Sequence, residues 1–390
     1  MKIISVDLYA LKLNSPLFHP VICRINTDEG IYGYGEAGIA FGVGAEAAYG
    51  ILKDYAPLII GMDPMNNEVI WEKLVKTTFW GQGGGGIIFA GISALDIALM
   101  DIKGKALGVP VYKLLGGKFR DKLRCYASQL QAGWKKNEPA GSPEEYARCA
   151  LDAVNDGYDA IKIDFLRIAE DKSAAPHDTF QKVLAKDKLD MIERRVRAVR
   201  EAVGPDIDLI LENHAATNAV SAVQMANICE KYNIFFYEEI TAPLLPQMHR
   251  QASQKITIPI ASGERIYSRW GYAPFFTDGS IQVIQPDIGN CGGLTEAKKI
   301  CDMAHIYDIS MQAHVWASPI MIAGALHLET AVPNFLIHEV HRGTVMSPCR
   351  DLCEVVNEPV NGFISVSELP GIGNELNSYA VSHADKTVIK

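Results

Sequence analysis

The sequence lacks the features of a membrane-spanning or secreted protein. Its longest apolar stretch, residues 87–100, is shorter than the roughly 20 residues of a transmembrane helix and contains Asp96. The N-terminus reaches Asp7 without a long hydrophobic segment, so we expect no signal peptide. Of the eight cysteines only Cys349 and Cys353 are close, and no second pair or histidine stands at zinc-like spacing. We therefore expect reduced cysteines in a cytoplasmic protein.

The chain also lacks an excess of positive charge. It has 37 lysines and arginines against 46 aspartates and glutamates, which gives a formal net charge of −9. This balance argues against nucleic acids and anionic membranes as partners. It does not exclude a small anionic substrate, because a bound divalent cation would dominate the local field.

The four glycines at residues 83–86 are not followed by the Lys-Ser/Thr pair of a phosphate-binding P-loop. We interpret this run as a flexible loop that lets the first domain approach the mouth of the second domain. Residues 14–20 are expected to form another such loop.

The first part of the chain is typical of an α+β domain. Segments between residues 3 and 36 alternate like β-strands, with a hairpin turn at residues 28–30. Apolar residues at steps of three and four from Ile92 to Ile102 then predict a helix that ends near Gly104.

From Leu123 onward, short apolar runs alternate with helical patterns, which indicates a parallel sheet. Seven or eight such units favour closure into a (β/α) barrel. The expected strands end at Lys162, Glu212, Glu238, Glu264, Asp287, His314 and Glu339. The expected helices include residues 143–155, 187–203, 219–232 and 295–307, and a long loop is expected around residues 169–184.

These patterns together predict an α/β protein with a modified TIM barrel, (β/α)7β, and an N-terminal α+β capping domain. We assign residues 1–122 to the capping domain and residues 123–345 to the barrel. Residues 346–390 have little barrel character and are expected to pack back on the capping domain, which they complete.

Three glutamates stand at even intervals in the barrel segment. Glu212, Glu238 and Glu264 are each 26 residues apart, the length of one β/α unit, and each follows an apolar run. They therefore lie at equivalent strand ends, which converge on the face where barrel active sites are found. Converging carboxylates repel one another unless a cation lies between them, and hard oxygen ligands suit Mg²⁺. The spacing thus predicts a metal site.

The ordered strand-end residues resemble the enolase superfamily. The resemblance rests on Gly263-Glu264, Gln285-Pro286-Asp287, Ala313-His314 and Glu339, with the glutamate ladder, Lys162 and the first-domain segments at residues 94–105 and 114–117. It is strongest to the mandelate-racemase-like branch. It implies a Lys or His base and an ene-diolate stabilised by one Mg²⁺ per subunit. It also implies a homo-oligomer that acts on a small carboxylate substrate.

Residue roles follow from the chemistry of removing a proton next to a carboxylate. The metal would be held by the three glutamates, because the developing dianion needs a cation. His314 is the expected base, with Asp287 holding its other ring nitrogen. Glu339 is expected to hydrogen-bond the substrate carboxylate or the ene-diolate oxygen.

Two further features favour dehydration over racemisation. His214 lies two residues beyond Glu212, where a histidine in related sugar-acid dehydratases is the general acid for the departing hydroxyl; those enzymes usually have Asp at the position of Glu212. Racemases carry Lys-x-Lys on the second strand, whereas this chain has Asp164 in place of the second lysine. Lys162, Asp164, Arg265 and Trp316 are expected substrate contacts; Trp80 could also wall the pocket.

We therefore predict a hydro-lyase that converts an aldonate or aldarate to a 2-keto-3-deoxy acid. The alternatives are an epimerase, racemase or cycloisomerase that uses the same ene-diolate, and a non-catalytic sensor that retains the site. A metal-dependent hydrolase on a similar barrel would need histidines and bridging carboxylates, which the glutamate ladder does not supply. The particular sugar acid is left open.

Overall fold

A computed structural model describes residues 1–13, 18–176 and 178–390. Part of the loop expected at residues 14–20 therefore lies outside the described residues, as does His177 within the loop expected at 169–184. None of the described helices combines the length and the apolar character that crossing a bilayer requires.

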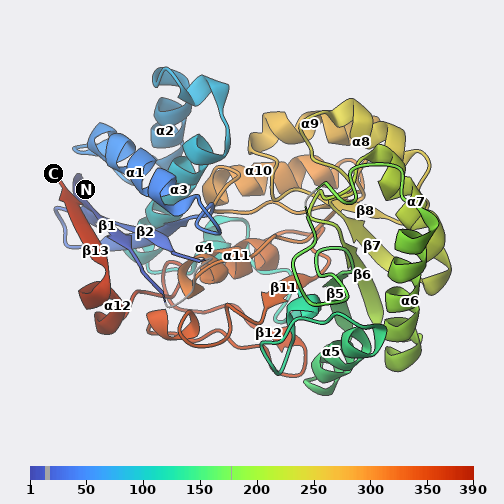
Figure 1. Ribbon diagram of the computed structural model, residues 1–390. Helices are drawn as coiled ribbons and strands as arrows, with labels where there is room; N and C mark the ends of the chain where they lie inside the picture. The colour runs from blue at the N-terminus through green and yellow to red at the C-terminus, as the bar shows by residue number, and fades with distance from the viewer. Residues whose placement is uncertain (14–17, 177) are drawn as a thin grey trace.

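The capping domain is built on a four-stranded antiparallel sheet of order β13-β1-β2-β3. Its strands are β1 (Ile3–Ala10), β2 (Val21–Thr27), β3 (Tyr32–Ala37) and β13 (Asp385–Ile389). Its helices are α1 (Ala45–Ile59), α2 (Asn67–Glu72), α3 (Gly86–Leu107) and α4 (Val111–Leu114). Because the C-terminal strand pairs with the first strand, both termini lie side by side at the left of Figure 1. The prediction that the C-terminal segment completes the capping domain is confirmed.

The second layer is a parallel barrel of eight strands among the described residues, in the order β10-β9-β8-β7-β6-β5-β4-β11. The strands are β4 (Leu123–Ser128), β5 (Ala160–Asp164), β6 (Asp208–Glu212), β7 (Ile234–Glu238), β8 (Ile260–Ser262), β9 (Val283–Ile284), β10 (Ser310–Met311) and β11 (His338–His341). The ring closes where Met311 N donates to Asn334 O at 2.7 Å and Leu336 N donates to Met311 O at 2.7 Å.

Seven helices connect the eight strands, so the predicted (β/α)7β arrangement is confirmed. They are α5 (Pro143–Asn155), α6 (Lys186–Val203), α7 (Ala219–Cys229), α8 (Pro246–Ser253), α9 (Ser268–Asp278), α10 (Gly293–His305) and α11 (Pro319–Ala331). Figure 1 shows α5 to α10 around the outside of the barrel. The C-terminal segment adds β12 (Phe363–Ile364), which pairs with β4, and α12 (Ser378–His383).

Some boundaries differ from those expected. Helix α3 does not end near Gly104 but continues to Leu107 and is capped by Gly108, whose φ is 67°. Gly104 serves close packing instead, because a Cβ there would lie 2.7 Å from Gly371 Cα. Strands β8, β9 and β10 end two or three residues before Glu264, Asp287 and His314, since the chain turns towards the next helix and leaves the ladder.

Two buried carboxylates of the capping domain anchor it to the barrel. Glu36 of β3 accepts hydrogen bonds from Ser318 N (2.9 Å), Ser318 Oγ (2.5 Å) and Met321 N (3.2 Å) at the start of α11. Asp96 of α3 accepts from Thr295 N (2.8 Å) and Thr295 Oγ1 (2.6 Å) at the start of α10. Burial raises the pKa of each carboxyl to about 7. These contacts place helix N-termini against side chains that satisfy their free N–H groups.

Candidate active site

The three glutamates of the ladder lie at the C-terminal mouth of the barrel. Glu212 and Glu238 are the last residues of β6 and β7 and are paired across the ladder, and Asp164 at the end of β5 pairs with Glu212. Glu264 follows β8 by two residues. The strand geometry thus gathers these carboxylates at one edge, as barrel topology requires.

Lys162 of β5 neutralises part of this negative charge. Its buried ammonium lies 3.0 Å from Glu212 Oε2, 2.6 Å from Glu238 Oε1 and 2.7 Å from Glu339 Oε1. Burial opposes its charge, but Glu238 and Glu339 raise the pKa of Lys162 well above the usual value. The structure therefore surrounds the ammonium of Lys162 with protein carboxylates.

One ammonium does not balance four buried carboxylates. Burial, followed by the charge of Glu212, raises the pKa of Glu238 well above its usual value, and burial raises that of Glu264. Burial also opposes the charge of Glu212, but His214 and Lys162 hold its pKa below the usual range. Glu238 Oε2 is buried without a hydrogen-bond partner among the described residues. Unpaired buried carboxylate oxygens of this kind fit a hard divalent cation such as Mg²⁺.

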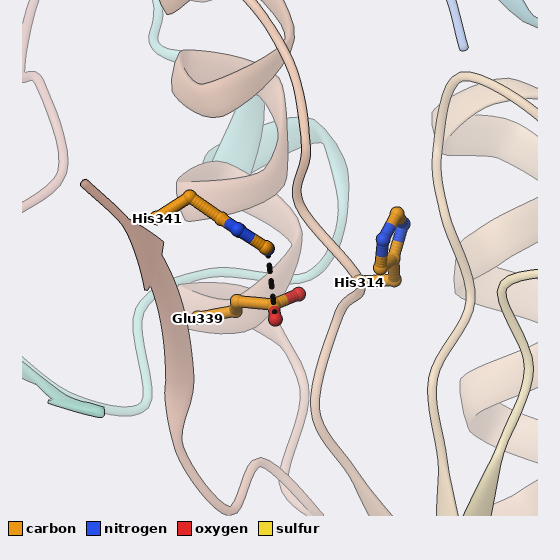
Figure 2. Close-up of side chains that lie close together, drawn as sticks. All are labelled: His314, Glu339 and His341. Atoms are coloured by element: carbon orange, nitrogen blue, oxygen red, sulfur yellow. Dashed lines mark ion pairs between the residues drawn. The ribbon is translucent and has the colours of Figure 1, made fainter. Parts of the chain in front are cut away.

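A second group of side chains could also hold an ion. In Figure 2, Glu339 and His341 of β11 approach each other, with His314 beside them. Their ligand atoms all lie within 4.8 Å of one another, which the described search does not find for the three glutamates. However, the ammonium of Lys162 already lies 2.7 Å from Glu339 Oε1, and two imidazoles are poor partners for Mg²⁺. The glutamates therefore suit this metal better.

His314 and Asp287 form a hydrogen-bonded dyad. His314 Nδ1 lies 2.7 Å from Asp287 Oδ2, while Asp287 Oδ1 accepts from Gly289 N at 2.7 Å. The other ring nitrogen, Nε2, faces Glu264 Oε2 at 3.3 Å. Burial opposes a charged ring, but Glu264 and the hydrogen bond to Asp287 raise the pKa of His314 to about 10. The dyad leaves Nε2 directed at the carboxylate cluster.

His214 and Asp164 form a second dyad. His214 Nδ1 lies 2.6 Å from Asp164 Oδ2, and Asp164 Oδ1 accepts from Leu166 N (2.7 Å) and Arg167 N (3.0 Å). Burial opposes the charged ring, but Glu212 and Asp164 raise the pKa of His214. Both oxygens of Asp164 are thus engaged within the protein. Since β6 and β10 are four strands apart in a ring of eight, His214 and His314 follow opposite strands of the barrel.

Glu339 is surrounded by hydrogen-bond donors. Its Oε1 accepts from Ser128 Oγ at 2.9 Å and faces His341 Nε2 at 3.0 Å, and its Oε2 accepts from Val315 N at 3.0 Å. Burial opposes its charge, but Lys162 and His341 lower the pKa of Glu339 well below the usual value. A carboxylate in this state accepts hydrogen bonds and has no proton to donate. This geometry suits a group that orders its neighbours better than one that donates to a substrate.

Arg265 and Trp316 lie around the mouth. Arg265 Nη1 is 2.7 Å from Glu264 Oε1 and also pairs with Glu239. Arg265 lines a cavity of about 770 Å³ between the barrel and the glycine-rich loop of the capping domain. Trp316 packs edge-on against His341, with ring centroids 4.5 Å apart, and against Phe41 at 5.4 Å. Trp80, by contrast, is 74% exposed.

Several residues that contact the site were not singled out by the sequence. Ser128 ends β4, His341 follows Glu339 by two residues, and Gln129 and Gln131 reach the His214 dyad. The two-residue step from Glu339 to His341 is the one available signal, because alternate residues of a strand share a face. The glutamines carry no such signal.

The central role of Lys162 predicts a large stability change. We expect Lys162→Met to lower the free energy of unfolding by about 3–5 kcal/mol in the presence of EDTA, because it leaves buried carboxylates without their cation. Added Mg²⁺ should recover part of this loss. Denaturant unfolding with and without Mg²⁺ measures both effects.

Lys231→Met is the matched control, since it removes an ammonium paired with Glu193 at 2.5 Å on the surface. It should change stability much less. If Lys162→Met unfolds at the same denaturant concentration as the unsubstituted protein in EDTA, the ammonium does not balance the cluster.

The sequence was compared with known families and proteins. Residues 145–380 match the family described as enolase C-terminal domain-like, and residues 18–116 match the N-terminal domain of mandelate racemase / muconate lactonizing enzyme. A D-galactonate dehydratase from Pectobacterium atrosepticum is 32% identical over 99% of this chain and 95% of its own length. A D-xylonate dehydratase from Haloferax volcanii is 31% identical over 93% of this chain and 84% of its own.

The fold is also found in solved structures. A member of the enolase superfamily from Salmonella Typhimurium is 51% identical, covers all of both chains and superposes with a TM-score of 0.97. Both domains are thus matched, in sequence and in architecture. The chain belongs to the mandelate racemase/muconate lactonizing enzyme branch of the enolase superfamily.

Proposed function

We propose that this protein is a Mg²⁺-dependent sugar-acid dehydratase, which removes water from an aldonate or aldarate to give a 2-keto-3-deoxy acid. The observation that carries the proposal is the pair of histidine–aspartate dyads on opposite sides of a buried glutamate cluster. The names of the D-galactonate and D-xylonate dehydratases, about 30% identical to this chain, support the same reaction class.

Glu212, Glu238 and Glu264 would hold one Mg²⁺ per subunit. Their hard oxygen donors and the unpartnered Glu238 Oε2 support this assignment. When bound, the cation supplies positive charge that offsets the charge developing on the substrate carboxylate as the neighbouring proton leaves. Arg265, which pairs with Glu264, and Trp316, beside His341, are proposed contacts at the edges of the substrate site.

The two histidines would divide the proton transfers. His314, held by Asp287, takes the proton from the α-carbon at Nε2, and His214, held by Asp164, gives a proton to the leaving 3-hydroxyl. One C–H bond and one C–O bond break, a C=C bond forms, and water leaves. The enol then takes a proton at C3 and becomes the 2-keto acid. Glu339 keeps Lys162 and His341 in place at the same mouth.

Epimerisation at the α-carbon is the second candidate. It is favoured by the same dyads, because two imidazoles on opposite sides of the site could remove and return a proton from opposite faces. Dehydration remains the first choice, since the dehydratase names of the relatives support it and epimerisation produces no keto acid.

We also propose that the chain works as a homo-oligomer in the cytoplasm. Phe79, Trp80 and Leu244 are 83%, 74% and 90% exposed, and large exposed apolar side chains mark contact surfaces. All eight cysteines are free and buried, which fits a reducing compartment. Light scattering during gel filtration tests the assembly; a single species of 42.7 kDa would contradict it.

A screen of sugar acids for 2-keto acid formation tests the proposed function. We expect at least one aldonate or aldarate to give a 2-keto acid with Mg²⁺ and none to do so with excess EDTA. Formation of an epimer without keto acid would favour the second candidate. Equal activity with and without EDTA would contradict the metal assignment.

A further inference from the structure

Four hydrogen bonds form a closed chain around His214. The backbone N–H of Asp164 donates to Gln131 Oε1 at 3.1 Å, and Gln131 Nε2 donates to Gln129 Oε1. Gln129 Nε2 then lies 3.1 Å from His214 Nε2, and His214 Nδ1 lies 2.6 Å from Asp164 Oδ2. The chain therefore begins and ends at one residue, Asp164.

The first bond determines the direction of all the others. A backbone N–H can only donate, so the atom of Gln131 that faces it must be the carbonyl oxygen. The amide nitrogen of Gln131 then faces Gln129, whose own nitrogen is directed at His214. An amide N–H needs an acceptor, so His214 Nε2 presents its lone pair while Nδ1 carries the proton towards Asp164.

The local backbone holds these glutamines in place. Gln129 directly follows β4 and has a φ of 62°, a left-handed conformation that costs energy for a residue other than glycine. Gln131 lies in the short helix Leu130–Ala132 and is only 6% exposed. A buried amide with all its polar atoms engaged has little freedom to rotate.

We propose that Gln129 and Gln131 are positioning residues for His214, which hold its ring with Nδ1–H towards Asp164 and the Nε2 lone pair towards the site. The inference rests on the proposed dehydration, in which the same Nε2 gives its proton to the leaving hydroxyl. The hydrogen-bond chain matches the neutral imidazole that remains after this transfer. It contacts neither His314 nor Asp287 through any of the bonds described above, so removal of the α-proton is independent of it.

The test separates the two proton transfers. Gln131→Glu keeps the acceptor for Asp164 N–H but loses the donor to Gln129, and Gln129→Ala removes the contact with His214. With a sugar acid that the enzyme dehydrates, in deuterium oxide with Mg²⁺, we expect dehydration to fall by at least about tenfold in both variants. Incorporation of deuterium at the α-carbon of recovered substrate should stay within about twofold.

Gln224→Ala is the matched control. Gln224 also uses both ends of its amide, accepting from Leu184 N at 2.8 Å and donating to Leu184 O at 3.2 Å, but it does not contact His214. Both rates should stay near those of the unsubstituted enzyme. Equal loss of exchange and dehydration in the Gln129 and Gln131 variants would overturn the proposal, as would unchanged dehydration.

A measurement without substrate keeps the inference separate from the proposed function. In ¹⁵N-histidine-labelled protein with Mg²⁺, the signals of His214, assigned by their loss in His214→Asn, should show a proton on Nδ1 and none on Nε2. The Gln131→Glu variant should change them. A proton on Nε2 in the unsubstituted protein would overturn the proposal, whether or not any sugar acid is dehydrated.

Discussion

His314→Asn should abolish both turnover and exchange of the α-proton with solvent. The substitution removes Nε2, which faces the carboxylate cluster, and breaks the 2.7 Å contact with Asp287 that orients the ring. Loss of a positioned general base costs about 10²–10⁴-fold in rate, and no other group on that side is placed to replace it in the proposed mechanism. Turnover and deuterium incorporation into recovered substrate, followed by NMR with Mg²⁺ present, measure the effect.

His327→Asn is the control for loss of a buried histidine. His327 lies in α11 between Tyr112 N and Ile372 O and does not contact the site. The folded fraction of this variant should retain exchange. Substantial exchange in folded His314→Asn would show that another group removes the proton.

His214→Asn should have a different effect: dehydration is lost while α-proton exchange persists. Its ring is held by Asp164 and Gln129, away from the Asp287–His314 dyad, so removal of the α-proton does not depend on it. Without a proton donor for the hydroxyl, the elimination slows by about 10²–10⁴-fold, and the abstracted proton returns to the same carbon.

The same NMR experiment measures deuterium in recovered substrate and the amount of keto acid. Circular dichroism and Mg²⁺ binding control for folding and for the metal site. If His214→Asn and His314→Asn lose exchange equally, with both controls intact, the division of roles between the two histidines is wrong.

Much of the fold follows from local sequence patterns. The helix expected at residues 143–155 is found as Pro143–Asn155, because Ser142 and Glu145 form a capping box and proline occupies the first turn. The strands β9 and β10 are only two residues long, so their ends depend on where neighbouring strands stop pairing. A periodic pattern carries no information about that, which explains the boundary differences there.

The site divides in the same way. Spacing along the chain predicts which strand ends carry carboxylates and histidines, since one β/α unit has a nearly constant length. It does not predict which atoms are already engaged, because this depends on barrel closure and side-chain direction. The contacts of Lys162 with three carboxylates, and those of Gln129 and Asp164 with His214, join different strands and could be found only in three dimensions.

The most direct measurement follows the sugar acid identified by the screen as it turns over in deuterium oxide with Mg²⁺. Removal of the α-proton, loss of the 3-hydroxyl and protonation of the enol by solvent predict a 2-keto-3-deoxy acid with deuterium at C3, detected by NMR. Recovery of only an epimer labelled at C2, with no keto acid, would contradict dehydration as the function of this site.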